Sequence, residues 1–283
     1  MIFSYNLLLS TFGTVSNSTQ HTLGPKPKRT TIITMNPAIT MISSINFEAV
    51  ELLRRGSFHE AAQLLASGLK SLRGAIRNDS FTGDTGEGAA AEQGHQEPIS
   101  PTTVKICQDE EDGGNDQASS HLALHEGPFE LFDRAFVFQH DGVSEVLIGK
   151  SPENLKRMMS VLLYNMAVAY HLRGTRRGEV SQKHLKTSAK MYKMALQLID
   201  DFEDGPVPGD LLIYMACLNN LGCVSGTFFE IDEVTAALQG VRTILEDCQF
   251  KTSQLDSEDF FHFSVTALIY DGCYGGMMAA PAA

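Results

Sequence analysis

The stretch LLYNMAVAYHLRG, residues 162–174, places Tyr164, Asn165, Tyr170 and His171 within eight positions of one another. Tyrosine and histidine can transfer protons, and asparagine can stabilise a developing oxyanion, so such a set could belong to an active site. The apolar residues between them recur at helical spacing, however, and Tyr170 falls on the same stripe as those apolar residues. We therefore interpret the stretch as a helix with Tyr164, Asn165 and His171 off its packing face.

Other motifs that carry chemistry are missing or incomplete. The sequence has no phosphate-binding loop, no dinucleotide-binding glycine pattern and no G-x-S-x-G nucleophile elbow. Its five cysteines form no CxxC pair and no zinc-like spacing. His121 and His125 are four residues apart, as two ligands on one helix face would be, but no motif supplies a third ligand. We predict no catalytic residue, no metal and no cofactor, with an enzyme or enzyme subunit of unknown class as the alternative.

The net charge of −12 is concentrated in one stretch of the chain. Residues 78–126 contain eleven acidic residues against the single base Lys105, which gives −10 and leaves −2 for the rest of the chain. The stretch is poor in large apolar residues and cannot bury enough surface to offset its ordering entropy, so we predict a disordered insert. No basic domain is left to bind nucleic acid, and no clean run of about 20 apolar residues is present to span a membrane. Unpaired cysteines in apolar runs favour a reducing compartment, and we expect an intracellular, cytoplasmic protein.

Helical spacing dominates the rest of the chain. Residues 40–77 predict an αα-hairpin, with Gly56 ending its first helix because glycine tolerates positive φ. Ser151, Pro152 and Glu153 form a helix start, and Gly174 is the predicted stop of that helix. Residues 184–201 predict its partner helix, and residues 210–229 and 231–247 predict a third helical pair.

Short strands are predicted in two places. Aromatic and β-branched runs at 131–139 and 143–148 flank Asp141-Gly142, which indicates a β-hairpin within residues 127–150. Alternating apolar residues at 261–269 indicate a C-terminal strand that could pair with this ribbon. We read residues 1–39 as a disordered arm, 151–275 as helical hairpins with that strand, and 276–283 as a tail.

The helical hairpins resemble one another. Ala49 precedes Gly56 by seven residues, as Ala167 precedes Gly174, and Leu221-Gly222 occupies the corresponding place in the last hairpin. This pattern of small residues resembles the tetratricopeptide repeat (TPR). The order FDRAFVF, LLYNMAVAYHLRG, KMYKMAL, LNNLG, FFHFSV is also similar to a large set of helical-repeat proteins of diatoms, a set without an assigned activity. The resemblance implies a mainly α fold: a TPR-like superhelix of αα-hairpins with a small antiparallel β-ribbon.

The resemblance also implies a binding groove. Asn165 and Asn220 occupy equivalent places, and in such arrays this asparagine often faces the concave groove and bonds the backbone of an extended ligand. His171 and Asn219 would face the same side. In the alternative interpretation these asparagines cap or bridge neighbouring hairpins. Asn46 and Asn219 stand where a clamp for a C-terminal carboxylate would need basic residues, so a clamp of that kind is not expected.

Four lysines recur at steps of three and four residues, which puts them on one helix face: Lys183, Lys186, Lys190 and Lys193. Such a stripe is usually only solvated, but it could also dock an acidic partner, including the chain's own acidic insert. Taken together, the sequence favours a non-enzymatic protein–protein interaction scaffold that binds a peptide or helix in its groove. A homo-oligomeric structural protein is a further alternative, and the sequence identifies neither the partner nor the oligomeric state.

Overall fold

The computed structural model describes residues 37–81, 101–106, 129–138, 152–175, 181–202, 208–247 and 257–273. Over these residues it contains seven helices and one two-stranded antiparallel sheet. The elements in chain order are α1 Pro37–Arg54, α2 Phe58–Phe81, β1 Pro101–Lys105, β2 Arg134–Phe138, α3 Pro152–Thr175, α4 Gln182–Asp200, α5 Pro208–Thr227, α6 Ile231–Asp247 and α7 Ser257–Cys273. A mainly helical fold with a small antiparallel ribbon is therefore confirmed.

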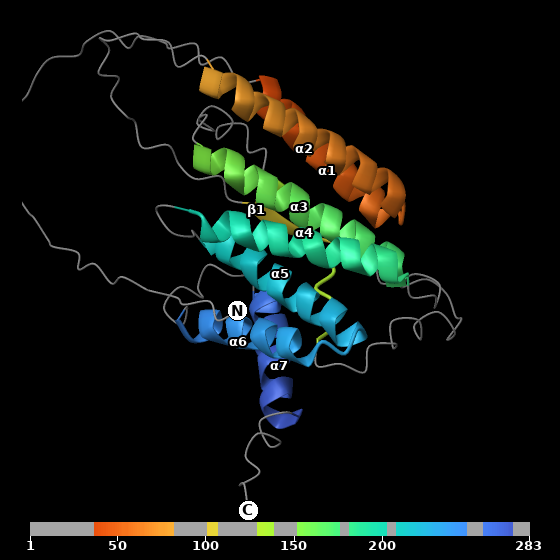
Figure 1. Ribbon diagram of the computed structural model, residues 1–283, viewed down its shortest axis with the longest axis vertical. Helices are drawn as coiled ribbons and strands as arrows, with labels where there is room; N and C mark the ends of the chain where they lie inside the picture. Colours follow the sequence, from red (N-terminus) through yellow and green to blue (C-terminus); the bar gives the residue numbers. More distant parts are fainter. Residues whose placement is uncertain are drawn as a thin grey trace, which may run out of the picture. The chain divides into compact units, whose positions relative to one another are not determined.

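Each helix packs against the next one in the chain, as Figure 1 shows for α1 to α4, which lie side by side with the strands behind α3 and α4. Gly56 separates α1 from α2 with a φ of 72°, and its N–H donates to Leu53 O at 2.9 Å. A residue with a side chain is strained at this φ, so the predicted role of Gly56 at the helix end is confirmed.

Gly174 has a different role from the predicted one. The helix α3 begins at Pro152 as predicted but continues through Gly174 to Thr175. A Cβ atom on Gly174 would lie 2.8 Å from Leu185 Cδ2 of α4. Gly174 is therefore a place of close approach between α3 and α4, and it does not stop the helix.

The ribbon has an unexpected partner strand. The predicted strand around residues 131–139 is present as β2, but it pairs with β1 in the register Thr103↔Phe136. The strand β1 lies inside residues 78–126, which we predicted to be disordered, so that prediction is wrong at this point. A β-branched run, Thr102-Thr103-Val104, is enough to form one strand but is hidden in the average composition of the acidic stretch. Residues 139–151, which include Asp141-Gly142 and the predicted strand 143–148, lie outside the described residues, as do residues 1–36 of the predicted arm and the tail. Residues 37–39 of that arm belong to α1 and residues 78–81 of the predicted insert belong to α2, so these two predicted boundaries are wrong by a few residues.

The C-terminal prediction of a strand is also wrong, because residues 261–269 belong to the helix α7. Its buried residues Asp259, Phe263 and Thr266 are spaced by four and three, which is the period of a helix face. The alternation over these few residues does not reflect burial, since Phe261 and Leu268 are apolar but 69% exposed. Two acidic residues in the first turn, Glu258 and Asp259, were the overlooked signal of a helix start.

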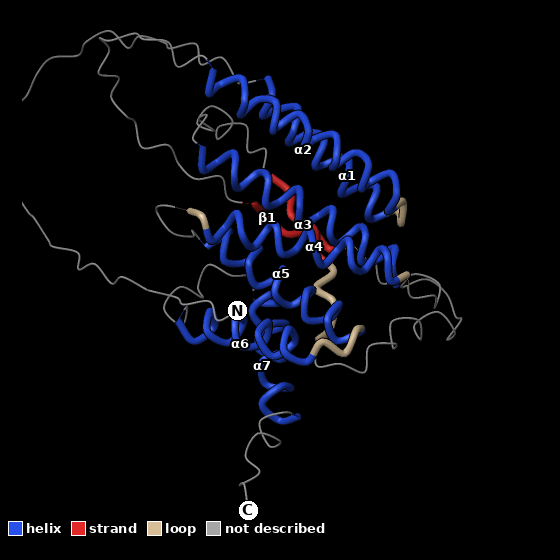
Figure 2. The backbone as a smooth tube through the Cα atoms, in the orientation of Figure 1, coloured by secondary structure: helices blue, strands red, loops and turns tan. Residues whose placement is uncertain are grey.

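The helices α1, α3 and α5 form the inner side of the stack, where the ribbon lies. β2 contacts α1 and α3 directly, and Asn220 of α5 bonds to the residues just before β2. In Figure 2 the red strands are seen behind α3 and α4. α3 and α5 are buried around most of their circumference, because helices cover them on two sides and the ribbon segment covers a third.

Candidate functional site

Residues 129–138 cross the inner helices in an extended conformation, held by side-chain amides. Asn220 Oδ1 accepts a hydrogen bond from Phe132 N at 2.8 Å, and its Nδ2 donates to Phe132 O at 3.1 Å. Asn165 does the same for Phe136, with distances of 2.9 Å to N and 2.7 Å to O. Each amide therefore satisfies both backbone groups of one residue, as a neighbouring strand would.

A second set of donors binds only carbonyl groups of this segment. Asn46 Nδ2 donates to Phe136 O at 2.9 Å, and Asn219 Nδ2 donates to Glu130 O at 2.7 Å. Between them, the hydroxyl of Tyr164 lies 3.1 Å from Arg134 O. These three residues each stand three positions before the small residue of their helix, which is Ala49, Ala167 or Gly222. We call Asn46, Asn165, Asn219 and Asn220 the amide row.

The two edges of the segment 129–138 form hydrogen bonds with different partners. Even-numbered residues from 130 to 136 turn their backbone groups to the inner helices, as the bonds above show. Odd-numbered residues face β1, and Ile106 N donates to Asp133 O at 2.9 Å beyond the end of the β1–β2 pairing. The segment is thus a strand with a true strand on one edge and the amide row on the other, which leaves its polar groups satisfied in a buried place.

The side chains of the segment are as buried as its backbone. Phe129, Phe132, Phe136 and Phe138 are exposed by 3%, 2%, 0% and 6%. Gly222 of α5 makes room for the first of them, because a Cβ atom there would lie 2.2 Å from Phe129 Cε2. The segment is accordingly part of the hydrophobic core.

The helix α7 closes over the segment. Arg134 Nε lies 3.1 Å from Asp259 Oδ1, and a second contact joins Arg134 to Glu258. Thr103 of β1 donates to Asp259 Oδ2 at 3.3 Å, and the rings of Phe132 and Phe263 lie 5.0 Å apart. The ribbon is therefore covered by the inner helices and by α7.

A polar cluster surrounds Asn220 and contains the residues that first suggested catalysis. Asn220 Nδ2 lies 3.2 Å from the hydroxyl of Tyr164 and 3.3 Å from that of Tyr192, which is 3.4 Å from His171 Nδ1. Burial raises the pKa of Tyr164 well above its ordinary value, with a contribution from Tyr192, and burial also raises the pKa of Tyr192. Both hydroxyls stay protonated and act as hydrogen-bonding groups within the core.

Two cysteines whose side chains are described also lack the features of a nucleophile. Cys217 and Cys223 are buried free thiols on α5, and burial raises the pKa of both. A nucleophilic cysteine requires the thiolate, which is favoured beside a base or at an exposed helix N-terminus. These two thiols are therefore suited to packing.

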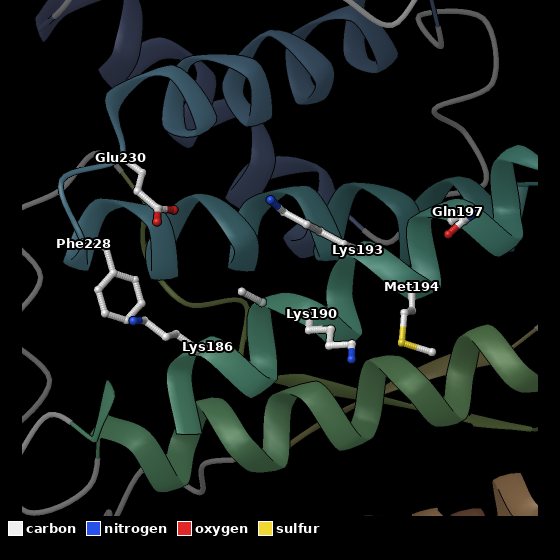
Figure 3. A pocket seen from close by; sticks show the side chains of 8 residues that line it. Lys186, Lys190, Lys193, Met194, Gln197, Phe228 and Glu230 are labelled. Atoms are coloured by element: carbon white, nitrogen blue, oxygen red, sulfur yellow. The ribbon is translucent and has the colours of Figure 1, made fainter. Parts of the chain in front are cut away.

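The four lysines of α4, which we call the lysine row, lie on the exposed outer face of that helix. Figure 3 shows Lys186, Lys190 and Lys193 projecting from α4 beside the turn between α5 and α6. Lys193 pairs with Glu233 of α6 at 3.1 Å, and Lys186 Nζ lies 5.7 Å from the centre of the Phe228 ring. Lys183 and Lys190 form no ion pair with any other described residue.

Two open hollows flank the lysine row. A hollow of about 380 Å³ lies between α4 and the α5–α6 turn, where Phe228, Glu230 and Met194 line it (Figure 3). A second hollow, of about 870 Å³, has Lys183, Thr187 and Met191 among its lining residues. Both combine cationic and apolar side chains.

The structure brings most of the predicted site residues together, but around the chain's own segment. Asn165, Asn219 and Asn220 are fully buried and bind the backbone of residues 130–136, whereas His171 is buried against Tyr192. Asn46 was not predicted as a binding residue, because it lies three residues before Ala49 while Asn165 lies two before Ala167. Its signal was the shared position with Asn219. The lysine row lies on the opposite, outer side of the stack.

No group of three or more His, Cys, Asp or Glu side chains that could hold a metal ion occurs in the described part of the chain. His121 and His125 lie outside that part. Among the described helices, none is long and apolar enough to cross a membrane. The chain matches no protein-family model, no curated protein and no solved structure. Its function must therefore be inferred from the site itself.

Proposed function

We propose that this protein is a non-enzymatic protein–protein interaction scaffold, built as a TPR-like array whose concave groove holds an extended peptide. The peptide is the chain's own segment 129–138, and partners bind to the outer face. The observation that carries this proposal is the amide row, in which equivalent asparagines of successive inner helices bind an extended backbone. A side-chain amide that bonds to backbone N–H and C=O groups favours a peptide in extended conformation, whatever its sequence. This kind of recognition is expected in a groove that holds a peptide.

The strength of the internal contact argues that the segment stays in place. Fully burying a phenylalanine contributes about 1.5–3 kcal/mol, so the four phenylalanines of the segment contribute about 6–12 kcal/mol. This burial, together with the hydrogen bonds of the amide row, opposes the conformational entropy that the segment would regain on release, about 1–2 kcal/mol per residue. A partner peptide that displaced the segment would have to replace nearly all of that burial. The inner face is therefore structural in the folded protein, and the outer face is left for partners.

A peptide added in trans tests whether the groove is closed. A fluorescent peptide that copies residues 127–140 is titrated into the full chain, with a scrambled peptide of the same composition as control. We expect no saturable binding, because the chain's own segment occupies the amide row. Micromolar binding of the copy, but not of the scrambled peptide, would show that the inner face is open to partners.

The size of the native complex tests the scaffold itself. The chain has a mass of 30.9 kDa. Purified gently from its own cells, it should elute with light-scattering masses above this value, and mass spectrometry should find a second protein in constant ratio. Elution as the lone chain, or only as multiples of its own mass, contradicts the scaffold proposal, and the latter result supports a homo-oligomeric structural protein.

A further inference from the structure

The positive charges of the lysine row are not stabilised by their position within the fold. Its members are separated by three, four and three residues, so each lysine has a like-charged neighbour on the same face of α4. No acidic residue lies in the first turn of α4, where Lys183 stands close to the positive end of the helix dipole. Apart from the pair of Lys193 with Glu233, no ion pair within the described residues compensates these charges.

The surroundings of the row are apolar and adaptable. Met191 and Met194 line the hollows beside the lysines, and Phe228 closes the smaller hollow at the α5–α6 turn. Methionine is flexible and polarisable, and it is common on surfaces that accept apolar side chains of varied shape. On the same turn Phe229 is 84% exposed and adopts a φ of 57°, a strained conformation for a residue with a side chain.

From this combination we infer that the outer face of α4 binds an acidic amphipathic helix of a partner protein. Carboxylates of the partner face the lysine row, and its apolar side chains enter the two hollows. The ten helical steps from Lys183 to Lys193 span about 15 Å, so a partner helix of similar length can present acids at matching positions. The inference rests on the proposed scaffold function and adds the place and the chemistry of the partner.

A helix fits these observations better than a nucleic acid or a membrane. The lysines stand at helical spacing between two hollows that are sized for side chains, whereas phosphate backbones and lipid headgroups need no hollow. The whole chain carries a net charge of −12, which repels large polyanions at long range. At physiological salt the Debye length is about 8 Å, so a short acidic helix interacts mainly with the lysine row.

The test uses a synthetic helical peptide of about 18 residues, a length at which an isolated helix can form. It carries glutamates at positions i, i+3, i+7 and i+10 and leucines beside them, and a matched peptide has glutamine at the same positions. Fluorescence anisotropy with the full chain should show binding of the glutamate peptide that weakens as salt is raised. The double variant Lys186→Glu/Lys190→Glu should weaken that binding by about tenfold or more.

A matched variant controls for overall charge. Lys70 and Arg73 are exposed on α2 and three residues apart, so Lys70→Glu/Arg73→Glu makes the same change in net charge elsewhere. It should leave peptide binding unchanged. A peptide with lysine in place of only the two central glutamates, at i+3 and i+7, should restore binding to Lys186→Glu/Lys190→Glu. The restored binding also shows that this variant is folded.

The inference is overturned if the glutamate peptide does not bind, if the glutamine peptide binds equally, or if both double variants lose binding to the same extent. Anionic vesicles or duplex DNA that bind the lysine row more tightly than the peptide would also overturn it in favour of another partner class. Failure of this inference can be distinguished from failure of the scaffold proposal. If only the inference about the lysine row is wrong, the native complex still contains a second protein, and Lys186→Glu/Lys190→Glu leaves that protein bound.

Discussion

At the scale of single residues, small side chains decide where the inner segment can lie. Gly222 is one of two glycines near the end of α5, and the other, Gly226, has no atom within 4 Å of the place of a Cβ. Only Gly222 faces an aromatic ring, that of Phe129, which is itself buried among Cys223, Val234, Ala237 and Leu238. The two glycines therefore form a matched pair for testing close packing.

We expect Gly222→Ala to destabilise the protein by about 1–3 kcal/mol, because the new methyl group overlaps a ring that has no free space to enter. Gly226→Ala should leave stability unchanged or raise it by up to about 1 kcal/mol, since alanine is the better helix former. Urea unfolding followed by circular dichroism measures both. Equal stabilities of the two variants would contradict the close approach of Phe129 to α5.

Asn220 is the residue with the most bonds in the amide row. Asn220→Ala leaves the N–H of Phe132 without a partner inside the core and leaves its C=O only the 3.3 Å bond from the Tyr164 hydroxyl. An unsatisfied buried group costs about 1–3 kcal/mol. We expect a loss in the free energy of unfolding of at least that size, measured in urea. Gln197→Ala removes an exposed amide from α4 and should change stability by less than about 0.5 kcal/mol. A similar small effect at Asn220 would mean that its bonds to Phe132 contribute little.

At the scale of elements, α7 connects the ribbon to the rest of the fold through a mixed polar and aromatic contact. His262 of α7 lies against Phe132 and Phe263, with ring centres 5.3 Å apart in both cases. Burial lowers the pKa of His262; the carboxylate of Glu130 opposes this shift, and the guanidinium of Arg134 adds to it. The folded protein thus favours the neutral imidazole.

This shift predicts a pH dependence of stability. An unfolded histidine binds a proton near pH 6.5, whereas folded His262 binds it only at lower pH. Its contribution to stability is therefore complete above about pH 6.5 and is lost as the pH falls below that value, where the unfolded state binds more protons. The variant His262→Gln should lose less stability than the wild type between pH 7.5 and 5.5, as measured by urea midpoints. Gln63→Ala, at an exposed amide of α2, should keep the wild-type dependence.

The elements also show what the sequence could predict and what it could not. Helices with a regular apolar stripe, such as α4 and α6, were predicted within a few residues, because that pattern is local. α7 was read as a strand because a short alternation of apolar and polar residues does not reveal which side chains are covered. The pairing of β1 with β2 joins residues about 30 positions apart, and no local pattern in either strand records its partner.

For the candidate site, too, local patterns could be predicted from the sequence and long-range contacts could not. The equivalence of Asn165 and Asn220 is visible in the sequence, and so is the shared position of Asn46 and Asn219. That these amides bind residues 130–136 of the same chain depends on the path of the ribbon, which only the assembled structure reveals. The lysine row was readable because all its members belong to one helix, while the hollows beside it depend on the α5–α6 turn.

At the scale of the whole molecule, the inner segment makes α1, α3, α5 and α7 parts of one cooperative unit. Each of these helices donates to, accepts from or packs against residues 129–138. Releasing the segment would expose its four phenylalanines and leave the buried amide row without partners, two costs that oppose the entropy gained by the released chain. We therefore expect the segment to be released only together with global unfolding.

Hydrogen exchange measures this cooperativity directly. The amide protons of Phe132 and Phe136 point at Asn220 and Asn165, so they should exchange only when the whole unit unfolds. Their opening free energies should equal those of core amides in α3, such as Leu163, and should fall by the same amount on adding urea. Exchange of Phe132 and Phe136 that is much faster than that of α3, and insensitive to urea, would reveal local release of the segment. The groove would then open in the folded protein, and the amide row would become accessible to a partner peptide.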